Sequence, residues 1–106
     1  MLNQAENTIK TSFTSAEVPV FVFDMHSTLK EIQAFPEVDS VYMNPSGYKL
    51  EFYIYYDKEN FEVEDKITKK ITDFEMTYKY FPEVFIYPLN MIESKELTLP
   101  KTAKEI

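Results

Sequence analysis

Three residue types that many functional sites need are absent or scarce: the sequence has no cysteine, no arginine and a single glycine. Without cysteine, the chain cannot build a disulfide scaffold, a thiolate zinc site, an iron–sulfur cluster or a cysteine nucleophile. One glycine is too few for the glycine-rich phosphate loops of nucleotide-binding proteins, which need several at fixed spacing. We therefore expect no cofactor of these kinds.

The charge is unbalanced toward acid, with 18 acidic and 11 basic residues and a net charge of −7. All the basic residues are lysines. Arginine is the side chain that best forms paired hydrogen bonds to phosphates and to guanine edges, and it is absent. Nucleic-acid binding also draws much of its affinity from basic patches. We therefore expect no nucleic-acid partner. The acidity favours solubility, and it would also suit a basic protein partner.

Long apolar segments are absent as well. The first residues, Met1–Glu6, lack the basic start and apolar run of a secretory signal. The longest apolar run, Val18–Phe23, is too short to cross a bilayer. We expect a cytoplasmic protein without membrane association.

The apolar content is nevertheless sufficient for one domain. A chain of 106 residues that are 44% hydrophobic can bury a core without cross-links. Residues 1–16 offer few apolar anchors, which predicts a flexible N-terminal arm, and residues 93–106 form a polar C-terminal tail. The expected folded domain is residues 17–92.

Apolar periodicity and turn residues divide this domain into alternating elements. The predicted order is a strand at Val18–Phe23, a helix from Asp24 to Pro36, a strand at Val38–Met43, a strand at Tyr48–Tyr56, a helix at Phe61–Phe81 and a strand at Val84–Leu89. A turn is expected at Asn44–Gly47, and Glu96–Leu99 is a candidate for one more short strand.

The order β-α-β-β-α-β predicts a fold class. The motif FPEV occurs at Phe35–Val38 and again at Phe81–Val84, each time between a helix and a strand. Two β-α-β halves of this kind form a ferredoxin-like α+β sandwich, with two helices on one face of a four-stranded antiparallel sheet. The first strand is the least constrained element, because everything after it also stands as α-β-β-α-β.

The stretch from Leu29 to Ile92 resembles the cytoplasmic C-terminal domain of cation diffusion facilitator transporters. It shares with that family the element order helix, strand, turn, strand, helix, strand, and a similar proline–valine entry to its strands. The resemblance implies the fold and a dimer. Domains of that family often bind metal through histidines near the strands, but this sequence has only His26. The metal-binding role therefore does not carry over.

Two groups of polar residues are candidate sites. His26, with Asp24 nearby, could act as an acid–base pair or half a metal site, or simply face solvent in a first helical turn. A set of acids around the start of the second helix could bind a hard cation, or could interact with the helix N-terminus. This acidic set is Asp57, Glu59, Glu62, Glu64 and Asp65. The solvent and helix-terminus interpretations are favoured, so we expect no metal site and no catalytic residues.

Aromatic residues, at 16% of the chain, are the strongest positive signal. If Phe52 and Ile54 face the helices, Tyr53 and Tyr55 lie on the opposite face of the sheet. The predicted interface on that face is Tyr42, Tyr53, Tyr55 and Tyr87, with Met43 and Phe85 as alternatives to Tyr42 and Tyr87. Either this aromatic face is open, or the arm or tail folds over it.

Three hypotheses for function follow. The first is a non-enzymatic protein-interaction module, with a second copy of itself as partner, that associates through the open aromatic face. The alternative is a small acidic inhibitor or immunity-type protein that binds a basic partner. The third is an enzyme, because one fold hosts many chemistries; no residue pattern supports it.

Overall fold

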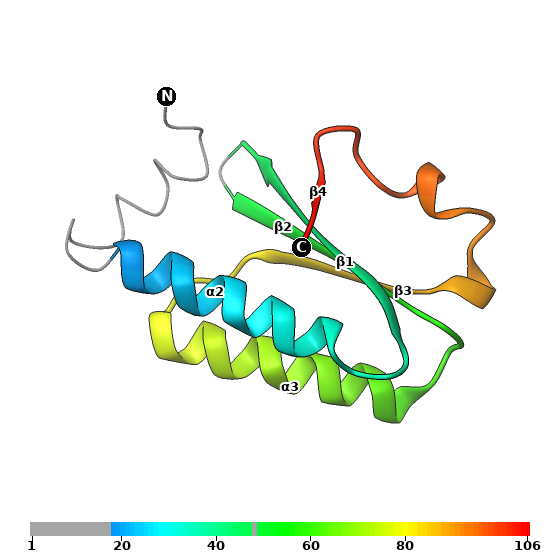
Figure 1. Ribbon diagram of the computed structural model, residues 1–106, viewed down its shortest axis with the longest axis horizontal. Helices are drawn as coiled ribbons and strands as arrows, with labels where there is room; N and C mark the ends of the chain where they lie inside the picture. Colours follow the sequence, from blue (N-terminus) through cyan, green and yellow to red (C-terminus); the bar gives the residue numbers. More distant parts are fainter. Residues whose placement is uncertain (1–17, 48) are drawn as a thin grey trace.

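The computed structural model describes residues 18–106 except Tyr48, and it has the expected α+β composition (Figure 1). The elements in chain order are α2 (Val18–Gln33), β1 (Val38–Ser46), β2 (Lys49–Tyr56), α3 (Phe61–Tyr78), β3 (Glu83–Pro88), two 3₁₀ turns (Leu89–Met91 and Lys95–Leu97) and β4 (Lys104–Glu105). The expected arm at residues 1–16 lies outside the described residues.

Within residues 18–106, the strands form one four-stranded sheet in the order β3-β2-β1-β4. β1 and β2 form an antiparallel hairpin, in which Tyr42 lies opposite Tyr53. β2 and β3 run parallel, and Tyr53 lies beside Phe85. β4 pairs with two residues of β1 at the other edge of the sheet.

The ferredoxin-like prediction of an all-antiparallel βαββαβ sandwich was wrong. In that fold, the first strand separates the strands that correspond to β2 and β3. Among the described residues no strand lies there, so β3 pairs directly with β2. Because β3 returns to the sheet through the crossover helix α3, it runs parallel to β2, and the sheet is mixed. The order α-β-β-α-β, which the sequence also allowed, is observed, followed by β4.

The error lies in Val18–Phe23, which was predicted as a strand but forms the first turns of α2. Its β-branched and aromatic residues favour strands only modestly, and tertiary packing overrides that preference. Phe21 lies four residues before Met25 and eight before Leu29, and all three are buried on one helix face. Pro19 is tolerated in the first turn, where its missing N–H would have no helical partner.

The second helix, α3, begins as predicted but ends earlier. Asn60 caps its start, since its side-chain oxygen accepts hydrogen bonds from backbone N–H groups of the first turn. The prediction extended the helix to Phe81, yet it ends at Tyr78. Lys79 takes the left-handed conformation with φ 55° and closes the helix. Pro82 further disfavours helical geometry in the residue before it.

The β1–β2 hairpin turns at Gly47, which has φ 56° and so uses the freedom that glycine alone has at little cost. β1 continues to Ser46, three residues beyond the predicted end of the strand at Met43. The loop is therefore tighter than the predicted turn Asn44–Gly47.

The hydrophobic core lies between the sheet and the two helices, on the face that we call the helix face. Alternate residues of β2 point into it, as the alternation predicted. The buried members are Phe21, Met25, Leu29, Ile32, Val41, Leu50, Phe52, Ile54, Tyr56, Val63, Ile67, Ile71, Phe74 and Tyr80. Tyr53 and Tyr55 point to the opposite face, which we call the aromatic face.

The C-terminal segment, residues 93–106, returns from the end of β3 toward β1 (Figure 1). The short strand proposed at Glu96–Leu99 is instead a 3₁₀ turn at Lys95–Leu97, and the strand in this segment is β4. No helix within residues 18–106 has both the length and the apolar character needed to span a membrane.

Candidate functional site

The aromatic face brings the predicted interface residues together. The ring of Tyr53 stacks on Phe85 with centroids 4.8 Å apart, and Tyr55 stacks on Tyr87 at 5.6 Å. Tyr42 meets Tyr55 edge-to-face at 5.9 Å. Tyr42, rather than Met43, therefore belongs to this face, and both Phe85 and Tyr87 do. Such ring pairs stabilise by about 0.5–1.5 kcal/mol beyond their buried area.

Lys95 anchors the C-terminal segment to this face. Its ammonium lies 5.2 Å from the ring centroid of Tyr42 and 5.7 Å from that of Tyr55. It also donates hydrogen bonds to Asp39 Oδ2 at 3.3 Å and Ser40 Oγ at 3.2 Å. Burial by itself would lower the pKa of Lys95, but the contacts with Tyr42 and Asp39 outweigh it and raise that pKa. The lysine is held as a cation.

Further polar contacts continue the attachment along the segment. Thr98 Oγ1 and the Tyr55 hydroxyl are hydrogen-bonded at 2.9 Å. The final backbone N–H, of Ile106, donates to the carbonyl oxygen of Val41 at 2.9 Å, and Gln33 Nε2 donates to the Ile106 carbonyl at 3.0 Å. No residue from 89 to 106 is fully buried. The segment is therefore attached mainly by polar contacts, with a smaller apolar contribution.

The aromatic face is consequently covered in part, so the alternative in which the tail folds over it holds for Tyr42 and Tyr55. Tyr55 is fully buried and Tyr53 is only 6% exposed. Burial raises the pKa of both phenols. That of Tyr53 rises to about 12, because the Glu51 carboxylate also accepts a hydrogen bond from its hydroxyl. Phe85 and Tyr87, on β3, stay partly exposed. The sequence offered no periodic signal for the covering segment, because its anchors are single polar residues.

β3 ends the sheet, and no strand among the described residues pairs with its outer edge. From Val84 to Tyr87 it carries only apolar and aromatic side chains. On the helix face, a groove of about 230 Å³ separates β3 from α3. It is lined by Thr68, Ile71, Thr72, Glu75, Val84 and Ile86. Burial raises the pKa of the Glu75 carboxyl in this groove.

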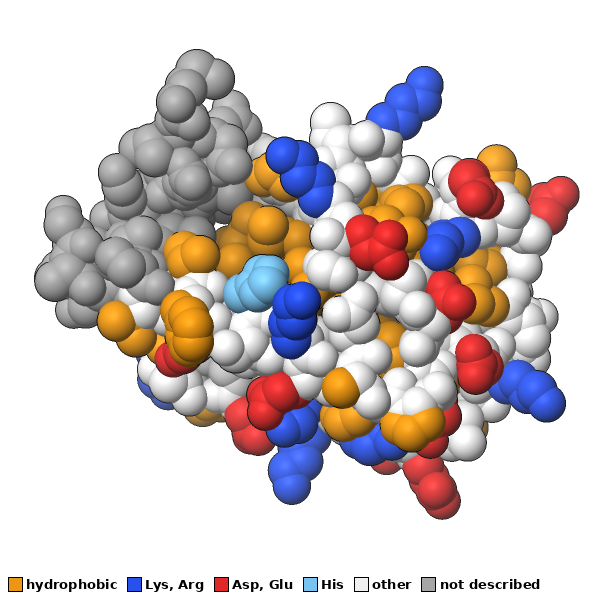
Figure 2. Space-filling view, viewed as in Figure 1, with side chains coloured by type: hydrophobic (Ala, Val, Ile, Leu, Met, Phe, Trp, Pro, Cys, Tyr) orange, Lys and Arg blue, Asp and Glu red, His pale blue; other side chains and the backbone are white. Residues whose placement is uncertain are grey.

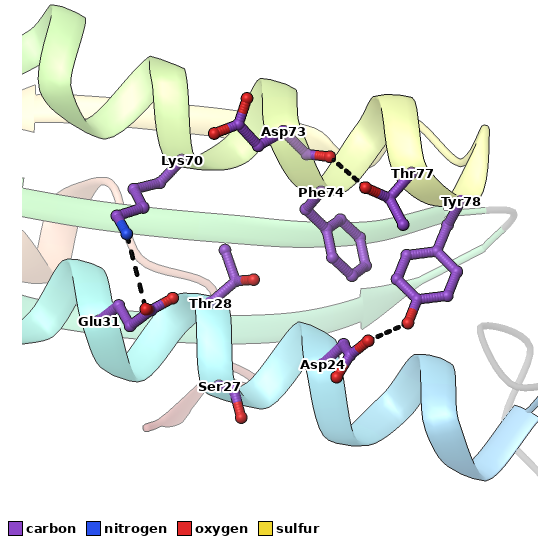
Figure 3. Close-up of a pocket in the computed structure, with 9 residues that line it drawn as sticks. All are labelled: Asp24, Ser27, Thr28, Glu31, Lys70, Asp73, Phe74, Thr77 and Tyr78. Carbon is purple, nitrogen blue, oxygen red and sulfur yellow. Dashed lines mark hydrogen bonds and ion pairs between the residues drawn. The ribbon is translucent and has the colours of Figure 1, made fainter.

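A second groove, of about 300 Å³, runs between α2 and α3 on the side away from the sheet (Figure 3). The Tyr78 hydroxyl donates a hydrogen bond to Asp24 across it, and that bond, with burial, raises the pKa of Tyr78 to about 12. Lys70 Nζ lies 3.5 Å from a carboxylate oxygen of Glu31. Figure 3 shows both pairs bridging the two helices. Their effect is to hold α2 against α3.

The polar candidates occupy ordinary positions. His26 is exposed on α2. In the acidic set, Glu64 accepts a hydrogen bond from the Tyr56 hydroxyl, which raises the pKa of Tyr56 to about 12 together with the larger effect of burial. No group of three or more His, Cys, Asp or Glu side chains in the described part of the chain is arranged to hold a metal ion. On the face in Figure 2, acidic and basic side chains are interspersed.

Comparison with known proteins finds no matching family model, no similar curated protein and no similar solved structure.

Proposed function

We propose that the protein is a non-enzymatic self-association module whose binding surface lies at β3. The observation that supports this most directly is the apolar outer edge of β3, which has no strand partner among residues 18–106. Natural proteins usually protect such an edge with lysines, prolines or bulges. Residues Val84–Tyr87 have none of these, Pro88 stands only at the last position of the strand, and the register with β2 is regular.

The aromatic face contributes its uncovered side to the same surface. Phe85 and Tyr87 lie next to the free edge and are partly exposed. Aromatic side chains are enriched in the cores of protein interfaces. The proposal keeps Tyr87 from the sequence-based interface and adds Phe85. Tyr42 and Tyr55 instead contact the C-terminal segment, and Tyr53 is buried against Phe85. The resemblance to a family of dimerising domains points the same way.

Sedimentation or light scattering over a wide concentration range tests the proposal. We expect the full chain to dimerise, and Phe85→Lys to raise the dimer dissociation constant by about tenfold or more, because the interface would have to desolvate a charge. Phe61→Lys is the matched control, since Phe61 is 77% exposed at the start of α3 and is not part of β3. It should leave association unchanged.

A wild-type chain that stays monomeric at every concentration would reject the proposal. Equal effects of the two lysine substitutions would also reject it, because they would place the interface away from β3 or reveal a general effect of charge.

A further inference from the structure

We propose that two copies join edge to edge, with β3 of one chain antiparallel to β3 of the other, about a two-fold axis that passes beside Ile86. This inference rests on the self-association proposed above and adds its geometry. The result would be one continuous sheet that crosses both chains. A face-to-face stack of two aromatic faces is disfavoured, because the C-terminal segment already covers Tyr55 and Tyr42 through Lys95 and Thr98.

The residues of β3 suit pairing with their own copy. Directly opposed residues in an antiparallel pair point to the same face of the sheet. In the register centred on Ile86, Phe85 lies opposite Tyr87 of the second copy, and Val84 opposite its Pro88. Ile86 meets its own counterpart on the helix face. Every opposed pair is apolar or aromatic.

The distribution of charge favours contact at β3 over contact elsewhere on the surface. The chain has a net charge of −7, so two copies repel each other over most of their surfaces. In the register centred on Ile86, the single acidic residue of β3, Glu83, falls beyond the opposed pairs. Its carboxylate is also 3.7 Å from the ammonium of Lys49 in the same chain. The edge of β3 is therefore a place where a second copy meets little repulsion.

The stacked rings would continue across the axis. Within one chain, Phe85 stacks on Tyr53 at 4.8 Å and Tyr87 stacks on Tyr55 at 5.6 Å. Placing Phe85 opposite Tyr87 of the second copy joins these two stacks end to end. The chain's own β3 reproduces this ring order in both directions, because Phe85 and Tyr87 exchange places across the axis.

The opposite edge of the sheet explains why pairing would stop at two copies. There the terminal strand β4 has two residues, Lys104 and Glu105, and both are charged. Short, charged edge strands resist further pairing. Two-fold pairing at β3 uses the same edge on both chains and is closed. The expected assembly is a discrete dimer.

Single cysteines test this geometry cleanly, because the chain contains no cysteine. Directly opposed residues of an antiparallel pair have Cα atoms about 4.5–5.5 Å apart, within the range that a disulfide spans. Under mild oxidation, Ile86→Cys should form a disulfide-linked dimer with its own copy. Phe85→Cys alone should not, whereas an equal mixture of Phe85→Cys and Tyr87→Cys should give the mixed dimer. Phe61→Cys, at an exposed site outside β3, is the unlinked control.

The mixed pair keeps the test valid if Ile86→Cys, which faces the core, does not fold. Absence of both the Ile86 and the mixed links in a sample that is dimeric by sedimentation would overturn the edge-to-edge geometry while leaving self-association intact. A link by Phe85→Cys alone would overturn the register centred on Ile86. A monomeric sample would remove the proposed function and this inference together.

Discussion

The two faces of β2 are both buried, but by different means. On the helix face, Phe52 and Ile54 lie beneath two helices and are surrounded by apolar side chains. On the aromatic face, Tyr53 and Tyr55 stack against the neighbouring rings of β3. They also lie beside a polar segment that contributes a lysine and a threonine. The comparison teaches that equal burial does not mean equal contribution to folding. We expect the helix face to determine global stability and the C-terminal cover to open locally.

Phe21 provides the largest expected effect on the helix-face side. Its ring contacts Phe74, Tyr78 and Tyr80 at centroid distances of 5.2–5.3 Å. Phe21→Ala should reduce the free energy of unfolding by about 3–5 kcal/mol, because it leaves a cavity in the core. Phe23→Ala is the matched control: Phe23 is 70% exposed and should change stability by less than about 0.5 kcal/mol. Chemical denaturation measures both, and similar losses would contradict the helical placement of Val18–Phe23.

At high pH, ionisation of a buried tyrosine on either face of the sheet should lower the free energy of unfolding by a similar amount. The pKa is about 12 for Tyr53 on the aromatic face and for Tyr56 on the helix face, and burial is the main cause in both. A pKa above the ordinary value of about 10 means that the folded state holds the phenolic proton more tightly. The resulting stability is fully present below pH 10 and is lost as the pH rises from about 10 to 12.

Substituting each tyrosine in turn tests whether Tyr53 and Tyr56 contribute equally to the loss of stability at high pH. Tyr53→Phe and Tyr56→Phe should each flatten the fall of unfolding free energy with pH by up to about 1.4 kcal/mol per pH unit. Denaturant titrations at a series of pH values give these slopes. A large effect of one substitution and none of the other would show that one hydroxyl is far more accessible to water than its buried position implies.

Substitution of Lys95 should have the smallest effect on global stability. It should also separate the two faces most clearly by their hydrogen exchange. Lys95→Met removes the ammonium and retains much of the side-chain volume. It should lower global stability by about 1 kcal/mol or less, as cation–π contacts at partly exposed sites do. Amide hydrogen exchange should accelerate in residues 95–106 and stay unchanged in α2 and α3. Lys101→Met, at an exposed lysine of the same segment, should change neither quantity. Uniform acceleration throughout the domain would show that this segment belongs to the global folding unit.

The fold was predictable from the sequence in those segments whose apolar pattern fits only one type of secondary structure. The alternation of β2 placed Phe52 and Tyr53 on opposite faces. Val18–Phe23 was not predictable in this way, because a short apolar run fits a buried strand or a helix turn equally well. The spacing from Phe21 to Met25 was the available signal. Omitting that strand would also have predicted the parallel pairing of β3 with β2.

The sequence predicted which residues belong to the candidate site, but not which of them the C-terminal segment covers. The sequence placed Tyr42, Tyr53, Tyr55 and Tyr87 among the candidates for one face, because side chains alternate along a strand. Lys95 and Thr98 gave no comparable indication. Their contacts with Tyr42 and Tyr55 join positions at least forty residues apart, and isolated polar residues have no period from which to infer a partner.

The sequence by itself therefore determined the class of the fold, the hairpin turn at Gly47, the start of α3 and the alternation along β2. All of these depend on interactions between near neighbours, which residue type and spacing specify directly. Only the tertiary structure decided that Val18–Phe23 is helical, that β3 lies parallel to β2, and that the C-terminal segment covers part of the aromatic face. These outcomes depend on which distant surfaces compete for the same burial, and that competition is resolved only when the whole chain packs.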